Sequence, residues 1–232
     1  MIRWHVGGYV VGFTTRVGGT SEGPYASLNL GFKTGDDPQR ARENRRIACG
    51  ALGADIGLLA NNHQVHSNRV VRAVPGQQGE EADGLWTTEP GIPLLAMTAD
   101  CLPIVLVRTE GTPALAVLHA GWKGLLADIV AAGVAALGGG ALAAAIGPAI
   151  GPCCYEVGEE VAAPYRERFG DDVVRGRHLD LWTSAERALR AARVPRVHRF
   201  DRCTSCEPET FFSHRRDHGV TGRQGAIAYV SG

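Results

Sequence analysis

Three short segments of the sequence carry side chains that can bind a metal ion or act as nucleophiles. NNHQVHS contains His66, TADCLP contains Cys101, and VLHAGWKG contains His119. Imidazole nitrogen and thiolate sulfur are good zinc ligands, and three protein ligands with an open fourth position are typical of a catalytic zinc site. The separations of 35 and 18 residues match no compact zinc motif. A buried core thiol, or a Cys101 nucleophile with His119 as its base, therefore stays open at this point.

Other histidines compete for the role of ligand. His63 precedes His66 by three residues, a spacing that gives two ligands one face only on a helix. We expect His63 not to bind the metal. His214 and His218 have the i, i+4 spacing of a helix, but the charged residues between them predict a solvated helix end.

The remaining cysteines are weaker candidates. Cys203 and Cys206 have the spacing of a metal knuckle or a redox pair, but no second such pair follows to complete a zinc site. We expect a structural role for them, or none. The adjacent Cys153 and Cys154 are interpreted as packing residues. Six cysteines in a chain whose beginning, MIRWHVGGYVVGF, lacks the layout of a secretion signal argue against a disulfide framework.

Two cations lie where they could bind an anion. Lys123 occupies the first turn of an expected helix, where free backbone N–H groups favour phosphate. Arg16 lies in the glycine-rich stretch RVGG, where the backbone can approach a ligand closely. A solvated cation is the alternative at both positions. The residues that we expect to bind substrate are Arg16, Asn29, Gln64 and Lys123.

Composition limits the classes of function. The 232 residues are 44% hydrophobic and carry 24 basic and 24 acidic side chains, so the net charge is near zero. A nucleic-acid-binding protein usually has a basic excess or a basic stripe, and neither is present. No run of 18 apolar residues occurs, which argues against a membrane span. We expect a soluble, cytoplasmic protein.

The pattern of apolar residues predicts a mixed α/β protein rather than a regular alternation of strands and helices. Ala114 to Ala120 is almost entirely apolar, which is typical of a sheet covered on both faces. Pro103 cannot donate to a strand ladder, so we expect a bulge or an edge there that presents Cys101. Strands are expected at 6–13, 70–74, 92–99, 103–108, 114–120, 141–146, 173–175, 196–200 and 226–230, helices at 37–53, 121–137, 158–169, 181–193 and 208–216, and long loops at 14–35 and 75–84.

Seven segments together resemble the YfiH family, also called the laccase-domain or polyphenol oxidoreductase family. They are TTRVGGTSEGPYASLNLG, QVHS, ADG, MTADCLPIVL, HAGWKG, AIGPAIGPCCYEVG and CTSCEPETFFSHRRD…TGRQGAIAYV, and they span the chain almost end to end. The resemblance implies a single domain over 1–232 with a layered α/β/β/α arrangement of mixed sheets. It also implies that His66, Cys101 and His119 are the metal ligands.

The resemblance implies a zinc-dependent purine nucleoside enzyme. Phosphorolysis of adenosine, inosine and methylthioadenosine is expected, with adenosine deamination alongside. The implied partners are purine nucleosides and phosphate, with no nucleic acid and no membrane, and the chain would be a monomer or a homodimer. Asp100 is the carboxylate nearest to Cys101 in sequence, and we expect it to move protons or to orient a ligand histidine.

Four alternatives stay open. They are a cysteine hydrolase that uses Cys101 and His119, peptidoglycan-precursor editing at the same site, copper-dependent phenol oxidation, and a metal- or nucleoside-binding module without turnover. A multicopper oxidase needs many histidines, several of them in His-x-His pairs, and this chain has eight histidines and no such pair. A blue-copper site usually adds an axial methionine, and only Met1 and Met97 are present. Bound Cu²⁺ could still support weak oxidation.

Overall fold

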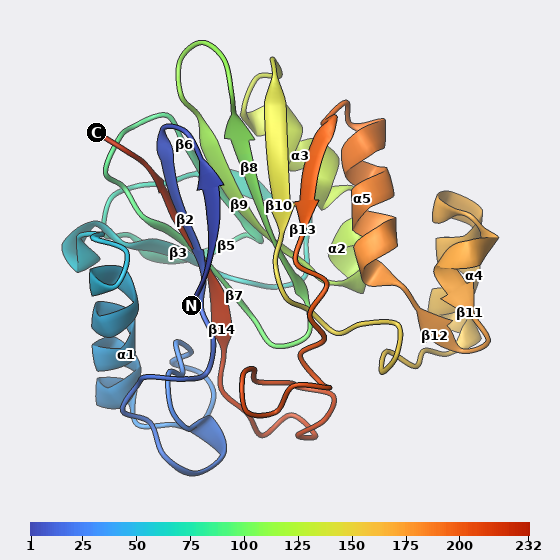
Figure 1. Cartoon of the computed structure of the whole chain (residues 1–232), viewed down its shortest axis with the longest axis horizontal. Coiled ribbons are helices and arrows are strands. Elements are labelled where there is room, and N and C mark those ends of the chain that lie inside the picture. The colour runs from blue at the N-terminus through green and yellow to red at the C-terminus, as the bar shows by residue number, and fades with distance from the viewer.

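Two six-stranded sheets lie face to face and are enclosed by helices (Figure 1). The computed structural model describes residues 1–232. In spatial order the first sheet contains β1 (Ile2–Val6), β2 (Tyr9–Phe13), β14 (Gln224–Val230), β7 (Leu94–Thr98), β3 (Ala60–His63) and β5 (Gln78–Glu81). The second contains β13 (Arg196–Arg199), β10 (Leu142–Ile146), β8 (Leu102–Arg108), β9 (Leu115–Ala120), β6 (Gly84–Thr87) and β4 (Val70–Arg72). A small third sheet pairs β11 (Val174–Arg175) with β12 (His178–Leu179).

The helices form the two outer layers. Helix α1 (Pro38–Gly50) covers the first sheet, and α2 (Trp122–Leu126), α3 (Ile129–Ala136), α4 (Glu159–Phe169) and α5 (Leu181–Ala191) lie on the side of the second sheet (Figure 1). Short 3₁₀ turns occur at Gly23–Tyr25, Ile56–Leu58 and Asp171–Val173. No helix combines the length and the apolar character that crossing a membrane requires.

Three apolar clusters separate these four layers. The smallest lies between α1 and strands β7 and β14, a second fills the space between the sheets, and the largest joins the second sheet to α2–α5. All residues of β9 are buried, as are all residues of β8 except its last. This burial confirms the expectation of a sheet covered on both faces, and the layered α/β/β/α arrangement of mixed sheets is confirmed with it.

Several local predictions are correct for the reasons given. The side chain of Asp37 accepts a hydrogen bond from the N–H of Gln39 and caps α1, while Pro38 occupies its first position. Helix α1 ends at Gly50, three residues before the expected end, and Gly53 then turns the chain with φ +70°. The left-handed backbone at that position favours glycine.

Other local predictions are wrong. The first strand is a hairpin of β1 and β2, which turns at Gly7-Gly8. The helix expected over 121–137 breaks at Asp128, whose φ of +69° ends α2 before α3 begins. Residues 78–81 lie in an expected loop but form strand β5. This strand lies at the edge of its sheet, is mostly exposed, and therefore lacks the apolar pattern that predicts a strand.

Two corrections concern the surroundings of Cys101. The segment 208–216 forms turns and no helix, because the N–H of Arg215 donates to the Asp100 carboxylate and the Arg216 guanidinium binds the carbonyl of Phe211. Pro103 lies neither at a bulge nor at an edge. It is the second residue of β8, pairs with His119 in regular register, and β8 lies between β10 and β9. The turn that presents Cys101 is made by Asp100, with φ +84°.

Candidate metal centre

His66, Cys101 and His119 converge at one end of the two sheets. His66 lies between β3 and β4, Cys101 lies between β7 and β8, and His119 is near the end of β9. Their ligand atoms all lie within 4.8 Å of one another. The centroids of the two imidazole rings are 4.8 Å apart. Three segments that are distant in sequence therefore bring two nitrogen donors and one sulfur donor to a single point.

His119 is fixed by a buried carboxylate. Its side chain is almost completely buried, and its Nδ1 lies 2.8 Å from Oδ1 of Asp83, which is 2% exposed. The backbone N–H of His119 also donates to the carbonyl of Asp83. With Nδ1 committed to the carboxylate, Nε2 is left as the ligand atom. A carboxylate that holds the second nitrogen of a histidine is the usual support of a metal ligand, since it sets the tautomer and the ring orientation.

The same carboxylate holds the loop of His66. The N–H groups of Val65, His66 and Ser67 donate to the Asp83 oxygens at 3.2, 3.0 and 2.6 Å, and the Ser67 hydroxyl donates at 2.7 Å. His66 has φ +62°, an uncommon conformation for a residue other than glycine. Asp83 thus stabilises a strained turn and positions two of the three ligands at once.

Asp100 shapes the turn before Cys101. Its Oδ1 accepts from the Thr204 hydroxyl, its Oδ2 accepts from the N–H of Arg215, each at 2.6 Å, and its carbonyl accepts from the N–H of Ile150 at 2.9 Å. These contacts anchor Asp100 to the segments after β10 and β13. The histidine-orienting role that the sequence left open for Asp100 belongs to Asp83, whereas proton transfer by Asp100 stays a prediction.

The electrostatics of the cluster match its geometry. Burial alone would raise the pKa of Asp83, but the hydrogen bonds from His119 and Ser67 outweigh it and lower that pKa well below its usual range. Burial would lower the pKa of His119, yet the nearby Cys101 and Asp83 raise it to about 9. Burial and the neighbouring His119 lower the pKa of His66. The site therefore favours a positive charge between the thiol and the carboxylate, which a proton or a metal ion can supply.

The donor set fits zinc. Ligand atoms of a tetrahedral site with Zn–N near 2.0 Å and Zn–S near 2.3 Å lie about 3.3 to 3.8 Å apart, and the potential ligand atoms of His66, Cys101 and His119 all lie within 4.8 Å of one another. Blue-copper chemistry fits less well, because the Met97 sulfur lies 3.4 Å from Nη2 of Arg45 and contributes no axial ligand. Of the two groups of potential metal ligands in the protein, only this one contains histidine, whereas a multicopper oxidase needs several histidine-rich sites.

Gly121 has no side chain, and the Cys101 sulfur and the His66 ring lie close to where a side chain would begin. A single added methyl group at this position should therefore disturb the site. A Cβ at this position would lie 3.0 Å from Sγ of Cys101 and 3.3 Å from Nδ1 of His66. Gly121 has φ −78° and ψ 176°, which alanine adopts freely. We expect Gly121→Ala to fold normally but to bind zinc at least about tenfold more weakly, comparable to other disturbances around a metal ligand.

Zinc affinity in competition with a chelator, together with the melting temperature, measures this effect. Gly50→Ala is the matched control, because a Cβ there meets nothing within 4 Å. Equal zinc affinity of Gly121→Ala and Gly50→Ala would contradict the geometry described above.

Three of the four expected substrate-binding residues make hydrogen bonds inside the protein. Arg16 donates to the carbonyls of Ala26 and Pro208. The side chain of Asn29 is fully buried and accepts from the N–H groups of Gly31 and Arg223. The Gln64 side chain donates to the carbonyl of Met97 and accepts from its N–H. Lys123 is the exception: it is exposed, and its Nζ lies 5.4 Å from the Trp122 ring centroid.

The structure also reveals residues that the sequence analysis missed. Asp83 stands in the ADG segment, and only the pairing of β6 with β9 places it beside His119. Cys153, Cys154, Cys203 and Cys206 form a second group of metal-binding type. Cys153 is exposed, contrary to its interpretation as a packing residue, whereas Cys154 does pack against the largest apolar cluster. His63 is separate from both groups, with Nε2 3.1 Å from Nζ of Lys33.

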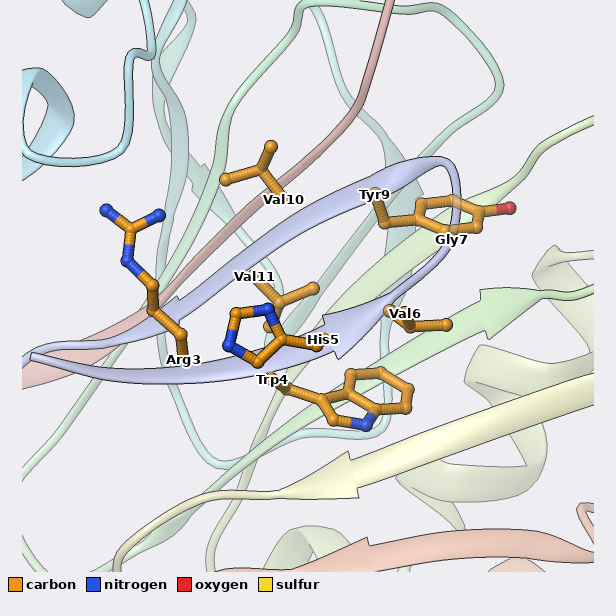
Figure 2. A pocket seen from close by; sticks show the side chains of 8 residues that line it. All are labelled: Arg3, Trp4, His5, Val6, Gly7, Tyr9, Val10 and Val11. Atoms are coloured by element: carbon orange, nitrogen blue, oxygen red, sulfur yellow. The ribbon is translucent and has the colours of Figure 1, made fainter.

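Two hollows of the protein lie away from the candidate metal centre. A hollow of about 440 Å³ is lined by the β1–β2 hairpin, with Arg3 and His5 on one side of β1 and Trp4 on the other (Figure 2). A second hollow, of about 570 Å³, lies among α2–α5 next to Phe169. Neither contains a group of metal ligands, so convergent chemistry and not volume identifies the candidate site.

Comparison with known proteins shows the family to which the chain belongs. The chain is 37% identical to "Purine nucleoside phosphorylase YlmD" of Geobacillus stearothermophilus over 96% of this chain and 90% of that protein. It is 36% identical to "Purine nucleoside phosphorylase YfiH" of Escherichia coli over 94% and 92%. The crystal structure of protein NMB0706 of Neisseria meningitidis superposes with a TM-score of 0.91 and 33% identity, covering 100% of this chain and 99% of that one. The family model "Multi-copper polyphenol oxidoreductase laccase" matches residues 10–231, and the chain belongs to that family.

Proposed function

We propose that the protein is a zinc-dependent purine nucleoside phosphorylase that acts on adenosine, inosine and methylthioadenosine and also deaminates adenosine. The observation that carries this proposal is the convergence of His66, Cys101 and His119 on one point, with Asp83 fixing two of them. The names of the relatives indicate nucleoside and phosphate as substrates. Three ligands leave the fourth position of a tetrahedral ion open, as in catalytic zinc sites.

The roles of the protein groups follow from their contacts. A bound zinc ion would polarise a substrate oxygen or lower the pKa of a water molecule. Asp83 keeps Nε2 of His119 directed into the site, and Gly121 keeps the space above the Cys101 sulfur open. Asp100 holds the Cys101 turn through Thr204. Asp100 is thus best understood as a positioning residue, although the sequence suggested a proton shuttle.

Phosphate requires a cation beside the metal ligands, and Arg223 is the strongest candidate. It is half-buried and makes no ion pair with any carboxylate. Burial lowers its pKa, whereas Cys101 and Asp100 oppose this effect. The pairing of Gln224 with Thr98 places Arg223 beside the segment that leads from β7 to Cys101. Only its Nη1 is used, on the carbonyls of Thr221 and Gly222, so other donors are free for an anion. Asn29 accepts from its backbone N–H and holds it in place.

We expect Arg223→Gln to raise the KM for phosphate roughly 10- to 100-fold. Hydrogen bonds to charged groups contribute about 1.5 to 3 kcal/mol, and each 1.4 kcal/mol is tenfold in binding. Arg223→Lys should recover part of the loss, because the charge is kept and the planar fork is not. Initial rates at varied phosphate and saturating inosine measure the effect.

Lys123→Gln and Arg16→Gln are the comparison variants, since the sequence alone favoured these two cations. A larger KM effect at Lys123 than at Arg223 would reverse the assignment. We expect Arg16→Gln to lower the melting temperature instead, because that guanidinium bonds to two carbonyls and lies 4.7 Å from the Phe212 ring centroid.

The activity itself is tested by product analysis. Inosine incubated with the protein should yield hypoxanthine and ribose 1-phosphate only when phosphate is present. Adenosine should yield adenine and ribose 1-phosphate under the same conditions. When phosphate is omitted it should yield inosine and ammonia, because water attacks purine C6 and the amino group leaves. Release of free ribose instead of ribose 1-phosphate would exclude phosphorolysis.

A second candidate function rests on a specific contact set. Cys101, His119 and Asp83 form the nucleophile, base and orienting carboxylate of a cysteine hydrolase. Peptidoglycan-precursor editing would use the same groups. This candidate leaves the position of His66 unexplained, because a cysteine hydrolase needs no second imidazole beside the thiol. Iodoacetamide distinguishes the two: a nucleophile reacts equally with and without zinc, whereas a zinc ligand is protected until the ion is removed.

A further inference from the structure

Four cysteines meet in the two loops whose residues Ile150 and Thr204 contact Asp100. Cys153 and Cys154 belong to the turn after β10, and Cys203 and Cys206 to the turn after β13. Strands β10 and β13 are parallel neighbours, and the bridge between Ala149 and Cys203 continues their pairing. Both turns therefore leave the same end of the sheet side by side.

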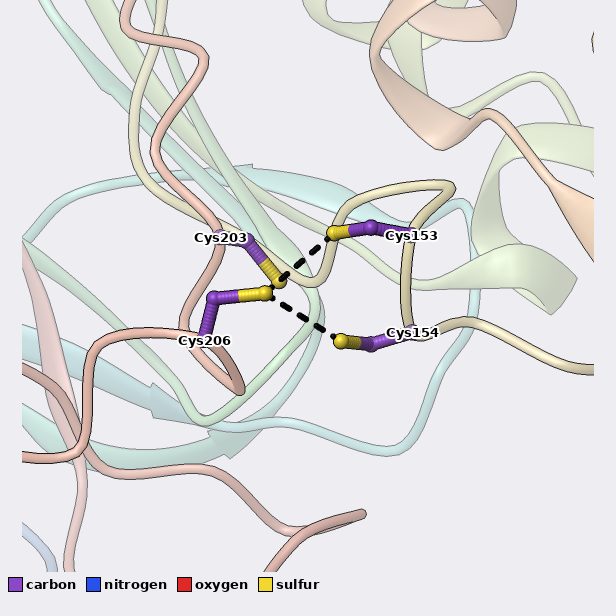
Figure 3. Close-up of side chains that lie close together, drawn as sticks. All are labelled: Cys153, Cys154, Cys203 and Cys206. Carbon is purple, nitrogen blue, oxygen red and sulfur yellow. Dashed lines mark hydrogen bonds between the residues drawn. The ribbon is translucent and has the colours of Figure 1, made fainter.

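The four sulfur atoms point toward one another (Figure 3). Sγ of Cys206 lies 3.4 Å from Sγ of Cys153 and 3.3 Å from Sγ of Cys154, and all four sulfur atoms lie within 4.8 Å of one another. All six cysteines of the chain are free thiols. Cys203 also accepts a hydrogen bond from the N–H of Gly151, a common support of a thiolate.

These separations are those of a mononuclear tetrahedral site. Four sulfur atoms bound to one zinc ion at about 2.3 Å lie about 3.8 Å apart. A disulfide would require one pair at about 2.0 Å. An iron–sulfur cluster inserts several ions between its thiolates and would need them farther apart. Four sulfur ligands without an open position are typical of a structural zinc site, not a catalytic one.

We propose that Cys153, Cys154, Cys203 and Cys206 bind a second, structural zinc ion. The site is independent of His66, Cys101 and His119, because the two groups share no residue. Its consequence for the catalytic region follows from two contacts: the Thr204 hydroxyl donates to the Asp100 carboxylate, and the N–H of Ile150 donates to the Asp100 carbonyl. An ion that ties the two turns together thus also holds the residue before Cys101.

Metal analysis of the full-length protein tests this proposal. Freshly purified wild-type protein should contain about two zinc ions per chain, one for each group. Cys206→Ser, at an exposed position, should lose about one ion and lower the melting temperature by several degrees. His119→Ala should also lose about one ion, and the double variant should lose both. Cys49→Ala removes a thiol outside both groups and should lose none.

Cobalt substitution identifies which ion is lost. Charge-transfer absorption from thiolate to Co²⁺ grows with the number of thiolates, so Cys206→Ser should lose most of it and His119→Ala only a small part. Unchanged zinc content in Cys206→Ser would overturn the proposal. A wild-type mass under non-reducing conditions that shows disulfides among the four cysteines would overturn it too. Neither result depends on nucleoside turnover, so failure here leaves the proposed function standing.

Discussion

Cys101→Ala is expected to remove the zinc ion from the His66–Cys101–His119 group and to reduce phosphate-dependent release of hypoxanthine from inosine by roughly 10³-fold or more. Loss of a partner that merely supports a metal ligand costs about 10- to 100-fold, and loss of a ligand should cost more. The thiolate is the only anionic ligand among the three. Without it, two neutral imidazoles must hold a doubly charged ion.

Zinc content and initial rates with saturating phosphate check this expectation in one preparation. Cys49→Ala is the control for the loss of a thiol, because Cys49 is a buried residue of α1 that belongs to neither cysteine-containing group. We expect the melting temperature of Cys101→Ala to stay close to that of His119→Ala, which loses the same ion and keeps the four-cysteine group. Full phosphate-dependent turnover by Cys101→Ala would refute the mechanism.

The second large effect is expected at Asp83. Asp83→Asn keeps the shape of the side chain but places an NH₂ group against either the N–H groups of the His66 loop or Nδ1 of His119. One of these partners then loses its acceptor. Turnover and zinc affinity should each fall about 10- to 100-fold. The variant should also be less stable by about 1 to 3 kcal/mol, the effect of a buried unsatisfied polar group.

Asp171→Asn serves as the matched control for the removal of one carboxylate charge, because Asp171 is exposed. Chelator competition reports zinc affinity, and urea unfolding reports stability. A wild-type zinc affinity in Asp83→Asn would show that the carboxylate supports the loop alone and not the ligand His119.

The three candidate ligands could be proposed from the sequence, because each stands near a strand end in a chemically unusual context. His119 closes an almost entirely apolar strand, and Cys101 interrupts an apolar run. Periodicity also predicted most strands. Four of the five expected helices account for all five α-helices of the structure, because the helix expected over 121–137 covers both α2 and α3. Burial on both faces gives strands such as β8 and β9 continuous apolar runs, which are readable without tertiary information.

The supporting groups were not predictable in the same way, because long-range strand pairing places them. Asp83 reaches His119 only through the pairing of β6 with β9. The cysteine group joins residues 52 and 53 positions apart in sequence through the parallel pairing of β10 with β13. Each pair of cysteines taken alone has too few ligands for a site, so spacing could not reveal the group.

The turn at Cys101 illustrates a different limit. A proline in a strand usually indicates an edge or a bulge. Pro103, however, occupies a regular position near the start of β8. The left-handed conformation belongs to Asp100 instead, where hydrogen bonds from Thr204, Arg215 and Ile150 stabilise it. These partners are at least 50 residues from Asp100 in the sequence, and no local sequence pattern predicts their contacts with it.

The central claim is that zinc held by His66, Cys101 and His119 is required for phosphorolysis of a purine nucleoside. The most direct measurement is the rate of ribose 1-phosphate formation from inosine by wild-type protein before zinc removal, after it, and after stoichiometric zinc is restored. We expect the rate to fall to background on removal and to return with zinc. An undiminished rate in metal-free protein, or no ribose 1-phosphate from the zinc-loaded protein, would contradict the claim.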